Sequence, residues 1–595
     1  MTLISQLATL ESSGLIHLAR AQPELEYLFR HALVHDAAYA SLVKADRLRL
    51  HHVVGEALER GYRDGPASRD LAPRLARHFH EAGDYARGLP YSIQAGDQAA
   101  AQYANAEAIT HYTRALDAAS QSASASTDQL RHIYTRRGLV LELNAQDAEA
   151  LANYEEMETV ARARGNRKLE LAGMAARATV YCKPTSVSDL ARGRALSERA
   201  LDLARELGDR EIEAKALWNL LMYYKSVGSL PDALQHGEKA LALARELNLR
   251  EQVAYVLNDI HAVYISAGHT QHARETLAEA QRLWRELGVL NMLADSLASS
   301  AAMHVFAGEF EPAFTAAEEA LRISQAIGNL WNQSYSLFML NLAYWERGEI
   351  GRAIEVSDEC IRLAEQAGFV PALIQARSVL ALIYGDMGAI ARGLEIAQTA
   401  QALADERFPT YRPMPLAVIA HLHMLAGNRA EAEIAFEAAH IALQGNAADI
   451  DAAFFEHVFI AESLLARNDY TGVVALVDEG VPLVRQRGMR AFLPDALGFK
   501  GKALLALGRV DEARAVLDEA RAEAEAIGSR RALWPILTAL SRIETQQGRV
   551  GEAESLRDQA RQHVDFIAEQ AGSPELRASF LNLPRVREAL RADEM

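Results

Sequence analysis

LASSAAMHVFAGEFEPAFTAAEEALRISQAIG, residues 297–328, and LFMLNLAYWERGEIGRAIEVSDECIRLAEQAG, residues 337–368, share one pattern and follow each other with a 40-residue period. Each begins with leucine, reaches a glycine eleven residues later and ends on a second glycine after twenty more. Between the glycines, two small residues stand seven positions apart and therefore lie on one helix face. The pattern predicts a helix, a turn, a second helix and a second turn.

The first glycine returns along the chain from about residue 210. It keeps the 40-residue period, except that one step is shorter by one and another longer by one, and asparagine replaces it once. Glycine and asparagine tolerate the left-handed conformation in which many helices end. These turn positions are Gly228, Gly268, Gly308, Gly348, Gly388, Gly427, Asn468, Gly508 and Gly548.

Other positions of the repeat recur at fixed distances from this turn. Five residues after it stands a mostly small residue, and another follows seven later, as in the pair Ala273 and Ala280. Each unit should therefore hold a first helix, called helix A, and a second, helix B, whose small residues let neighbouring helices approach closely. The unit closes on Gly208, Asn248, Gly288, Gly328, Gly368, Gly445, Gly488 or Gly528.

The composition agrees with a helical protein. Half of the 595 residues are apolar and 24% are charged, as is usual for a folded soluble chain. Proline is scarce at 16 residues, and alanine, leucine, glutamate and arginine, which favour helices, fill the segments between the glycines. We therefore expect an all-α fold.

The charge argues against two classes of partner. With 62 basic and 79 acidic residues, the net charge is −17, the wrong sign for a protein that mainly binds nucleic acid or an anionic membrane.

No long apolar run or secretory signal is found, so we expect a cytoplasmic protein. Two cysteines cannot by themselves form a disulfide framework or a four-ligand zinc site, so Cys182 and Cys360 are interpreted as packing residues.

The arrangement of large and small residues resembles the tetratricopeptide repeat family. Leucine stands mostly eleven residues before the turn and a larger residue, such as Tyr264 or Tyr344, stands four before it. The resemblance implies a right-handed superhelical solenoid of helix pairs with a concave binding face. The usual repeat has about 34 residues, so the 40-residue unit is more similar to the long-helix repeats of bacterial signalling ATPases and MalT-type regulators.

The first 60 residues do not repeat. Residues 27–39 read YLFRHALVHDAAY and residues 47–52 read RLRLHH. They resemble the winged-helix-like segment that follows the nucleotide-binding module of STAND-type signalling ATPases, especially those linked to adenylate or guanylate cyclases or to protein kinases. The resemblance implies three parts: a winged-helix-like segment at 1–65, about twelve helix pairs at 66–572 and a capping tail at 573–595.

In the resembled family the catalytic modules lie upstream, and no match to them is found here. The nearest approach to a phosphate-binding loop is Gly501-Lys502-Ala503, which lacks the required hydroxyl and has Ala496 at the first glycine position. The sequence offers no convincing strands for a cyclase-like metal site and no Gly-x-Ser-x-Gly motif. We expect no catalytic residues, no cofactor and no enzyme activity. The chain is either a stand-alone repeat protein or a piece of a longer product.

A histidine-rich start leaves a metal site as an alternative. His31 and His35 are four residues apart with Asp36 adjacent, a spacing that could present two imidazoles to one metal ion. Ala32 stands where a zincin would have glutamate. The favoured interpretation is that these side chains cap and pack the N-terminal segment, with no metal bound.

The inner face of the solenoid is the candidate binding surface. If the register of shorter repeats transfers, inward positions of helix A carry aromatic residues with polar residues beside them. Such a row would suit an extended peptide or an amphipathic helix; alternatively, the longer helices bury the aromatics between layers. Both interpretations stay open. The candidates are Trp218, Tyr255, Tyr335, Phe338, Trp345 and Phe455, with Lys215, Lys225, Asn258, Asp295 and Gln375.

The sequence thus favours a non-enzymatic interaction or sensor solenoid of a bacterial signalling system. It would bind a protein or peptide on its concave face and couple to an ATPase or cyclase module in cis or in trans. One alternative is a fragment of a larger cyclase-type or STAND ATPase. The other is a MalT/LuxR-like transcriptional regulator without its DNA-binding domain.

Overall fold

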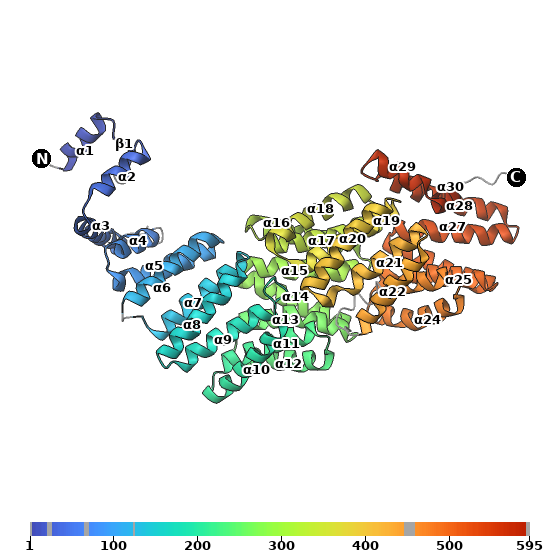
Figure 1. The fold of residues 1–595 in the computed structure, drawn as a ribbon, viewed down its shortest axis with the longest axis horizontal. Helices are drawn as coiled ribbons and strands as arrows, with labels where there is room; N and C mark the ends of the chain where they lie inside the picture. Colours follow the sequence, from blue (N-terminus) through green and yellow to red (C-terminus); the bar gives the residue numbers. More distant parts are fainter. Residues whose placement is uncertain (1–2, 21–25, 65–70, 123–124, 445–458, 591–595) are drawn as a thin grey trace. The chain divides into compact units, whose positions relative to one another are not determined.

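The computed structural model describes residues 3–20, 26–64, 71–122, 125–444 and 459–590 (Figure 1). The chain divides into two compact units, residues 1–144 and 145–595. The division falls inside the predicted repeat region at 66–572, so the first unit contains helix pairs as well as the N-terminal segment. Each unit is described by itself.

The first unit begins with an antiparallel hairpin between helices. The two strands pair Ile16 with Phe29 and Leu18 with Tyr27. The sequence shows no convincing strands, and this short hairpin was not predicted from it. Strands of five and four residues, with only Ile16 buried, give no readable alternation of apolar and polar residues. The elements are α1 (Leu3–Ser12), β1 (Ile16–Arg20), β2 (Glu26–Phe29), α2 (Ala32–Ser41) and α3 (Lys44–Asp64).

Four more helices complete the described part of this unit. The ring of Phe79 is fully buried, stacks on Tyr91 at 5.9 Å and lies under the Arg87 guanidinium at 4.8 Å. Tyr112 is also fully buried and donates its hydroxyl to Asp97 at 2.6 Å. The helices are α4 (Ala72–Glu81), α5 (Tyr85–Ala101), α6 (Asn105–Gln121) and α7 (Thr127–Leu143).

The second unit is a continuous stack of helix pairs. Odd-numbered helices from α9 to α27 are the predicted A helices and the following even-numbered ones are the B helices; the A helix before α24 is described at residues 459–466. The elements are α8 (Asp147–Ala163), α9 (Arg167–Cys182), α10 (Leu190–Leu207), α11 (Arg210–Ser226), α12 (Leu230–Glu246), α13 (Arg250–Ser266), α14 (Thr270–Leu287), α15 (Leu290–Phe306), α16 (Phe310–Ala326), α17 (Leu330–Arg347), α18 (Ile350–Ala367), α19 (Val370–Asp386), α20 (Ile390–Arg407), η1 (Pro409–Tyr411), α21 (Pro413–Ala426), α22 (Arg429–Gln444), α24 (Tyr470–Gln486), η2 (Arg490–Phe492), α25 (Leu493–Ala506), α26 (Val510–Ile527), α27 (Arg530–Gln546), α28 (Val550–Glu569), α29 (Pro574–Asn582) and α30 (Pro584–Leu590).

The predicted turns and helix pairs are confirmed. Every turn position from Gly228 to Gly548 has a positive φ, and Asn468 adopts 63° in place of glycine. The second column behaves in the same way, with Asn248 at 55°; Gly445 lies outside the described residues. The fold is therefore the all-α solenoid that the 40-residue period predicts.

Small residues form the contact between layers. The two alanine columns of helix B, exemplified by Ala273 and Ala280, are fully buried. Cys360 occupies one of these positions and is also fully buried, and Cys182 is 3% exposed. Both cysteines are free, so their interpretation as packing residues is confirmed.

The later repeats of the second unit contact its earlier repeats. In the middle repeats, the turn between helix A and helix B of one repeat lies against a residue near the end of a helix B. That helix B belongs to a repeat more than five repeats later in the chain. Contacts between α17 and α27 and between α15 and η2 belong to the same seam. The paired positions are Gly268 with Gln486, Gly308 with Ile527 and Gly348 with Ile567.

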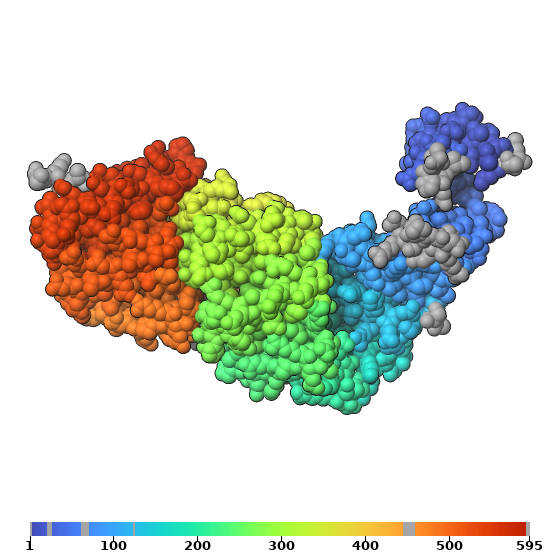
Figure 2. All heavy atoms as spheres, turned by 180° about the vertical axis from the view of Figure 1, so that it is seen from behind, coloured from blue at the N-terminus to red at the C-terminus, as the bar shows by residue number. Residues whose placement is uncertain are grey.

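The seam is close-packed at backbone level. The amide of Gly351 donates to the carbonyl of Gln570 at 2.6 Å, and Thr270 Oγ1 donates to the Arg487 carbonyl at 2.7 Å. Figures 1 and 2 show the orange and red helices of residues 470–590 lying directly against the green and yellow helices of the middle repeats. We call this junction the inter-turn seam.

Gly351 offers a sharp test of the seam. An added Cβ would lie 2.8 Å from Gly572 Cα and 3.2 Å from the Gln570 carbonyl oxygen, and backbone atoms cannot move aside cheaply. We expect Gly351→Ala to lower the free energy of unfolding by about 1–3 kcal/mol, as overpacking does. Calorimetric melting of the full chain measures the change.

Gly551 is the matched control, because it holds the same second position in α28 that Gly351 holds in α18, and no atom in the described part of the chain lies within 4 Å of its added Cβ. Gly551→Ala should be neutral or stabilising by up to about 1 kcal/mol, since alanine is the better helix former. Equal effects of the two substitutions would rule out a close-packed seam at Gly351.

Candidate functional site

The A helices form the inner layer of the second unit. α9 contacts α11, α11 contacts α13, and α15, α17, α19 and α21 contact one another in succession, whereas the described B helices show no comparable contacts with each other. Helices on the inside of a curved stack lie closer together than those outside. The inner face is therefore the face of the A helices, as in other helical-repeat solenoids.

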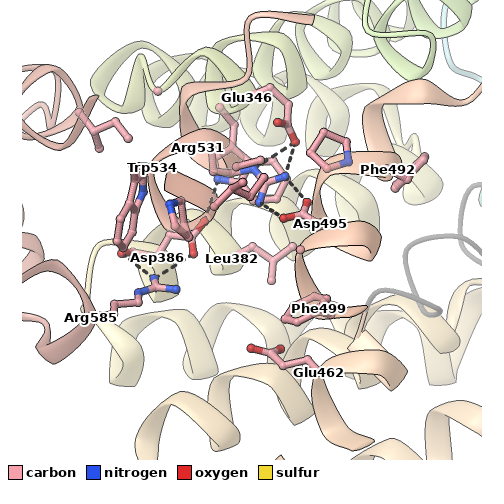
Figure 3. Close-up of a pocket in the computed structure, with 18 of the residues that line it drawn as sticks. Glu346, Leu382, Asp386, Glu462, Phe492, Asp495, Phe499, Arg531, Trp534 and Arg585 are labelled. Atoms are coloured by element: carbon pink, nitrogen blue, oxygen red, sulfur yellow. Dashed lines mark hydrogen bonds and ion pairs between the residues drawn. The ribbon is translucent and has the colours of Figure 1, made fainter. Parts of the chain in front are cut away.

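A cavity of about 420 Å³ lies on this face and is called the lumen pocket (Figure 3). Its lining comes mainly from α15, α17, α19 and α21 on one superhelical turn and from η2, α25, α27, α29 and α30 on the next, with Phe459 and Glu462 from the helix described at residues 459–466. It exists only because the seam brings these helices together. Its aromatic walls are Phe306, Trp345, Phe459, Phe492, Phe499, Trp534 and Phe580.

One guanidinium joins the pocket to the seam. Arg531 Nη2 lies 2.7 Å from Glu346 Oε1 and 2.5 Å from Asp495 Oδ2 (Figure 3). Ser529 donates to the other oxygen of Glu346 at 2.6 Å. Glu346 is 8% exposed, and burial raises the pKa of its carboxyl although Arg531 opposes this. The Arg531 guanidinium also lies 4.5 Å from the centre of the Trp345 ring.

A second pair bridges the turns on another wall. Arg585 Nη2 lies 3.2 Å from Asp386 Oδ1 and 3.3 Å from the Asp386 carbonyl oxygen (Figure 3). The indole of Trp345 donates to the other oxygen of Asp386 at 3.2 Å. Glu346 is therefore held by two groups of the next turn, and Asp386 by one group from each turn, which fixes the shape of the pocket.

Two further titratable pairs line the cavity. His421 Nδ1 is hydrogen-bonded to Glu462, and Arg542 is paired with Glu588. Burial opposes a charged His421, but Glu462 outweighs burial, and the net pKa of His421 is raised. The pocket thus combines aromatic walls with ionised groups that are mutually paired.

A separate polar cluster occupies the inner face nearer the start of the unit. Asp259 Oδ2 accepts from the Trp218 indole and Oδ1 accepts from Lys225 Nζ, both at 2.8 Å. Asn258 donates to Asp295 Oδ2 at 2.7 Å. Burial, together with Asp259, raises the pKa of Asp295 to about 6, although Asn258 and Lys225 pull it down. We call these five residues the Asp259 cluster.

The structure separates the sequence candidates into groups. Trp218, Lys225, Asn258 and Asp295 meet in the Asp259 cluster, whereas Trp345 lines the lumen pocket. Lys215 and Gln375 are partly buried on α11 and α19. Phe455 lies outside the described residues.

The other aromatics pack within the protein. Tyr255 lies between the rings of Trp218 at 5.1 Å and the fully buried Trp284 at 4.9 Å, and Phe338 is 4% exposed in the core. Tyr335 packs near Trp331 at 5.6 Å. Trp218 and Trp345 are themselves only 5% and 6% exposed. The predicted row is therefore largely buried, because the long helices bury their aromatic side chains between layers.

Sequence reasoning missed most of the pocket. Asp495, Arg531 and Arg585 gave no signal, because their partners lie 36 to 199 residues away, whereas Asp386 lies one repeat after its partner Trp345. Lys502 entered only as part of a failed phosphate-loop match, and it lies on α25 as a repeat-helix residue. The periodic spacing of helix A could have placed Asp259 beside Trp218, since the two lie 41 residues apart.

The histidines near the start of the first unit contact their own neighbours. His35 Nδ1 is 2.9 Å from the adjacent Asp36, and His31 is the N-cap residue of α2. Within the described ranges, no group of three or more histidine, cysteine, aspartate or glutamate side chains is placed to hold a metal ion. No helix there is long and apolar enough to cross a membrane.

No known family model matches the sequence, and no curated protein matches it. Among solved structures, three helical-repeat proteins are similar to this chain, each at 13% sequence identity. They are a Rap protein bound to competence and sporulation factor (TM-score 0.46; 60% of this chain, 99% of that chain), the APC/C heterotetramer Cut9–Hcn1 (0.44; 93% and 98%) and a STAND protein with a tetratricopeptide-repeat sensor from Pyrococcus horikoshii (0.37; 74% and 58%). Similarity at this level concerns the fold alone.

Removing Glu346 should weaken both superhelical turns. Loss of one partner of a buried ion pair costs about 3 kcal/mol or more, because Arg531 then loses a buried counter-charge. We expect Glu346→Ala to increase hydrogen exchange in α17 and also in α27. Glu311→Ala is the control: Glu311 is 82% exposed and pairs with Arg347 at 2.7 Å, so its loss should cost less than about 1 kcal/mol. Increased exchange confined to α17 would contradict a bridging role.

The raised pKa of Asp295 predicts a pH dependence. The folded state holds the proton up to about pH 6, above the ordinary value of 3.8, so ionised Asp295 destabilises the fold at higher pH. Asp295→Asn should raise the melting temperature above pH 6 and approach wild type near pH 4. Asp259→Asn should do the opposite at pH 7, because Lys225 loses its counter-ion. A lower melting temperature for Asp295→Asn at pH 7 would refute the assignment.

Proposed function

We propose that this chain is a non-enzymatic interaction and sensor solenoid whose second unit binds a peptide or protein segment on its inner face. The lumen pocket carries the proposal, since it is lined by two successive superhelical turns. A bound segment would contact both turns at once. Its binding energy would then favour the closed seam, which is how a ligand shifts a conformational equilibrium.

The lining suits an anchoring side chain of a partner. Binding hot spots are typically bulky apolar groups buried in a well-formed pocket beside a few fixed polar groups. Trp345 and Trp534 lie on walls from opposite turns, and Arg531 holds two carboxylates beside them. The volume of about 420 Å³ lies within the range of roughly 300–1,000 Å³ usual for ligand sites.

Coupling to an ATPase or cyclase module, in cis or in trans, belongs to the same proposal. It is supported by the resemblance of residues 27–52 to the segment that follows such modules. The first unit also exposes apolar side chains, among them Leu3, Ile4, Leu33 and Val43, which are 65–82% exposed. Large exposed apolar side chains are the kind of surface that a partner module would cover.

Filling the pocket tests the proposal. Gly498 lies on the wall contributed by α25, and among the described residues an added Cβ would meet only Ile536 Cγ1, at 3.6 Å. Gly498→Leu should therefore place a side chain in the cavity without unfolding α25. Peptides selected from a displayed random library on wild-type protein, and measured by calorimetry, should lose at least about 10-fold in affinity for the variant, since a blocked hot spot costs more than about 1.4 kcal/mol.

Gly480→Leu is the matched control, because Gly480 lies within α24, is absent from the pocket lining and has no atom of the described residues within 4 Å of its added Cβ. It should leave peptide affinity unchanged. If the selected peptides bind Gly498→Leu as tightly as wild type, the pocket is not the binding site and the proposal fails.

A further inference from the structure

Among the described residues that line the lumen pocket, the ionised groups are paired with one exception. Each carboxylate has an arginine guanidinium or, for Glu462, the imidazole of His421 beside it. The pairs are Glu346 and Asp495 with Arg531, Asp386 with Arg585, Glu462 with His421, and Glu588 with Arg542.

The exception is Lys502 on α25. No carboxylate of the described residues lies within ion-pair distance of its ammonium, which instead lies 5.3 Å from the centre of the Phe499 ring. Burial lowers the pKa of Lys502, and the nearby charges of Arg585 and Arg542 add to this, while Glu462 and Asp495 oppose it. A partly buried cation without a counter-ion is costly, so this position is prepared to accept an anion.

The arrangement along α25 places this cation beside an apolar wall. Gly498, Phe499 and Lys502 follow at helical spacing on the side that faces the cavity. Arg585 Nε, on another wall, is a buried donor without a hydrogen-bond partner in the described part of the chain. The unsatisfied groups of the pocket are therefore positive, and the remaining free surface is mainly aromatic and aliphatic.

We infer that the lumen pocket takes an organic monoanion, a bulky apolar body that carries one carboxylate, and that Lys502 is its counter-ion. The inference rests on the proposed function in that the pocket is the binding site. A cationic group would meet Lys502 with like charge. A neutral analogue would leave the ammonium desolvated and unpaired, and a small inorganic dianion would leave the aromatic walls uncovered.

Two dyes with the same apolar body test the charge preference. Anilinonaphthalene sulfonate carries one negative charge, and N-phenylnaphthylamine carries none. The pocket signal is defined as the fluorescence lost on Gly498→Leu. We expect wild type to bind the anionic dye at least about 10-fold more tightly in the pocket, as a charge-assisted contact in a dry site predicts.

Lys502→Met removes the charge and keeps the length and helix preference of the side chain. It should weaken the anionic dye by about 10-fold or more and leave the neutral dye bound equally or more tightly. Lys500→Met is the control on the same helix, because Lys500 pairs with Asp478 and is absent from the pocket lining; it should change neither dye. Melting temperatures at or above that of wild type for Lys502→Met, and close to it for Lys500→Met, check that both variants fold.

The outcomes separate the two hypotheses. Equal pocket affinity for both dyes, or an unchanged preference in Lys502→Met, overturns the monoanion inference but keeps the pocket as a binding site. If neither dye gives a signal that depends on Gly498, the proposed binding site itself fails.

A displacement experiment distinguishes the two sources of such a carboxylate. Indole propionate is compared with its amide, and a capped tripeptide with glutamate between two phenylalanines is compared with its glutamine counterpart. Displacement by the free acid alone indicates a small molecule, and displacement by the glutamate peptide indicates an acidic side chain of a partner. If the amide and the glutamine peptide displace the anionic dye as well as the acids do, the inference is wrong.

Discussion

The absence of a side chain at the A–B turn is the constraint on which the second unit depends. At Gly308 and Gly348 the backbone has a left-handed φ of 74° and 77°, which lets helix B fold back on helix A. The same lack of a Cβ lets Ile527 and Ile567 of the next superhelical turn approach closely. One residue type thus satisfies a local and a long-range requirement. Because the repeat length is nearly constant, the turns on both sides of the seam recur with the same period and stay in register.

The seam explains why the interior contains charged groups. Burying Glu346 and Arg531 costs desolvation that their attraction only partly offsets, so such pairs contribute more to specifying a geometry than to stability. Here the geometry is the alignment of α17 with α25 and α27, since Arg531 contacts carboxylates from both helices that face it. A solenoid held only by apolar contacts between turns could slip by one repeat. The hydrogen bonds of Ser529 and Arg531 to one carboxylate oppose that slip, because they require one partner at one position.

The 40-residue period made the fold predictable from the sequence. The pocket was not predictable, because its residues are far apart in the sequence. Helix pairs, turn positions and buried alanine columns follow from spacings no longer than one repeat, which a single sequence displays. The hairpin of Ile16–Arg20 and Glu26–Phe29 was missed because both strands are too short and too exposed to show a pattern. Of the inward aromatic candidates in the described chain, only Trp345 lines the pocket. The other candidates were assigned to the inner face from the register of shorter repeats. In this protein, helices of 16 to 18 residues bury Tyr255 and Phe338 within the protein. Arg531 and Glu346 meet across 185 residues, and no local spacing encodes that contact.

The two polar regions of the inner face differ in a way that bears on what they can do. In the Asp259 cluster, the Trp218 indole and the Lys225 ammonium both donate hydrogen bonds to the Asp259 carboxylate. The second carboxyl, Asp295, is desolvated, and burial raises its pKa. In the lumen pocket, the carboxylates of the described lining are paired and the group left over is a cation, Lys502. Perturbed titratable groups that a fold retains at a cost are candidates for function. The inner face thus carries a desolvated carboxyl in one region and a desolvated ammonium in the other, so under the proposed function a bound segment would meet groups of opposite charge at the two regions.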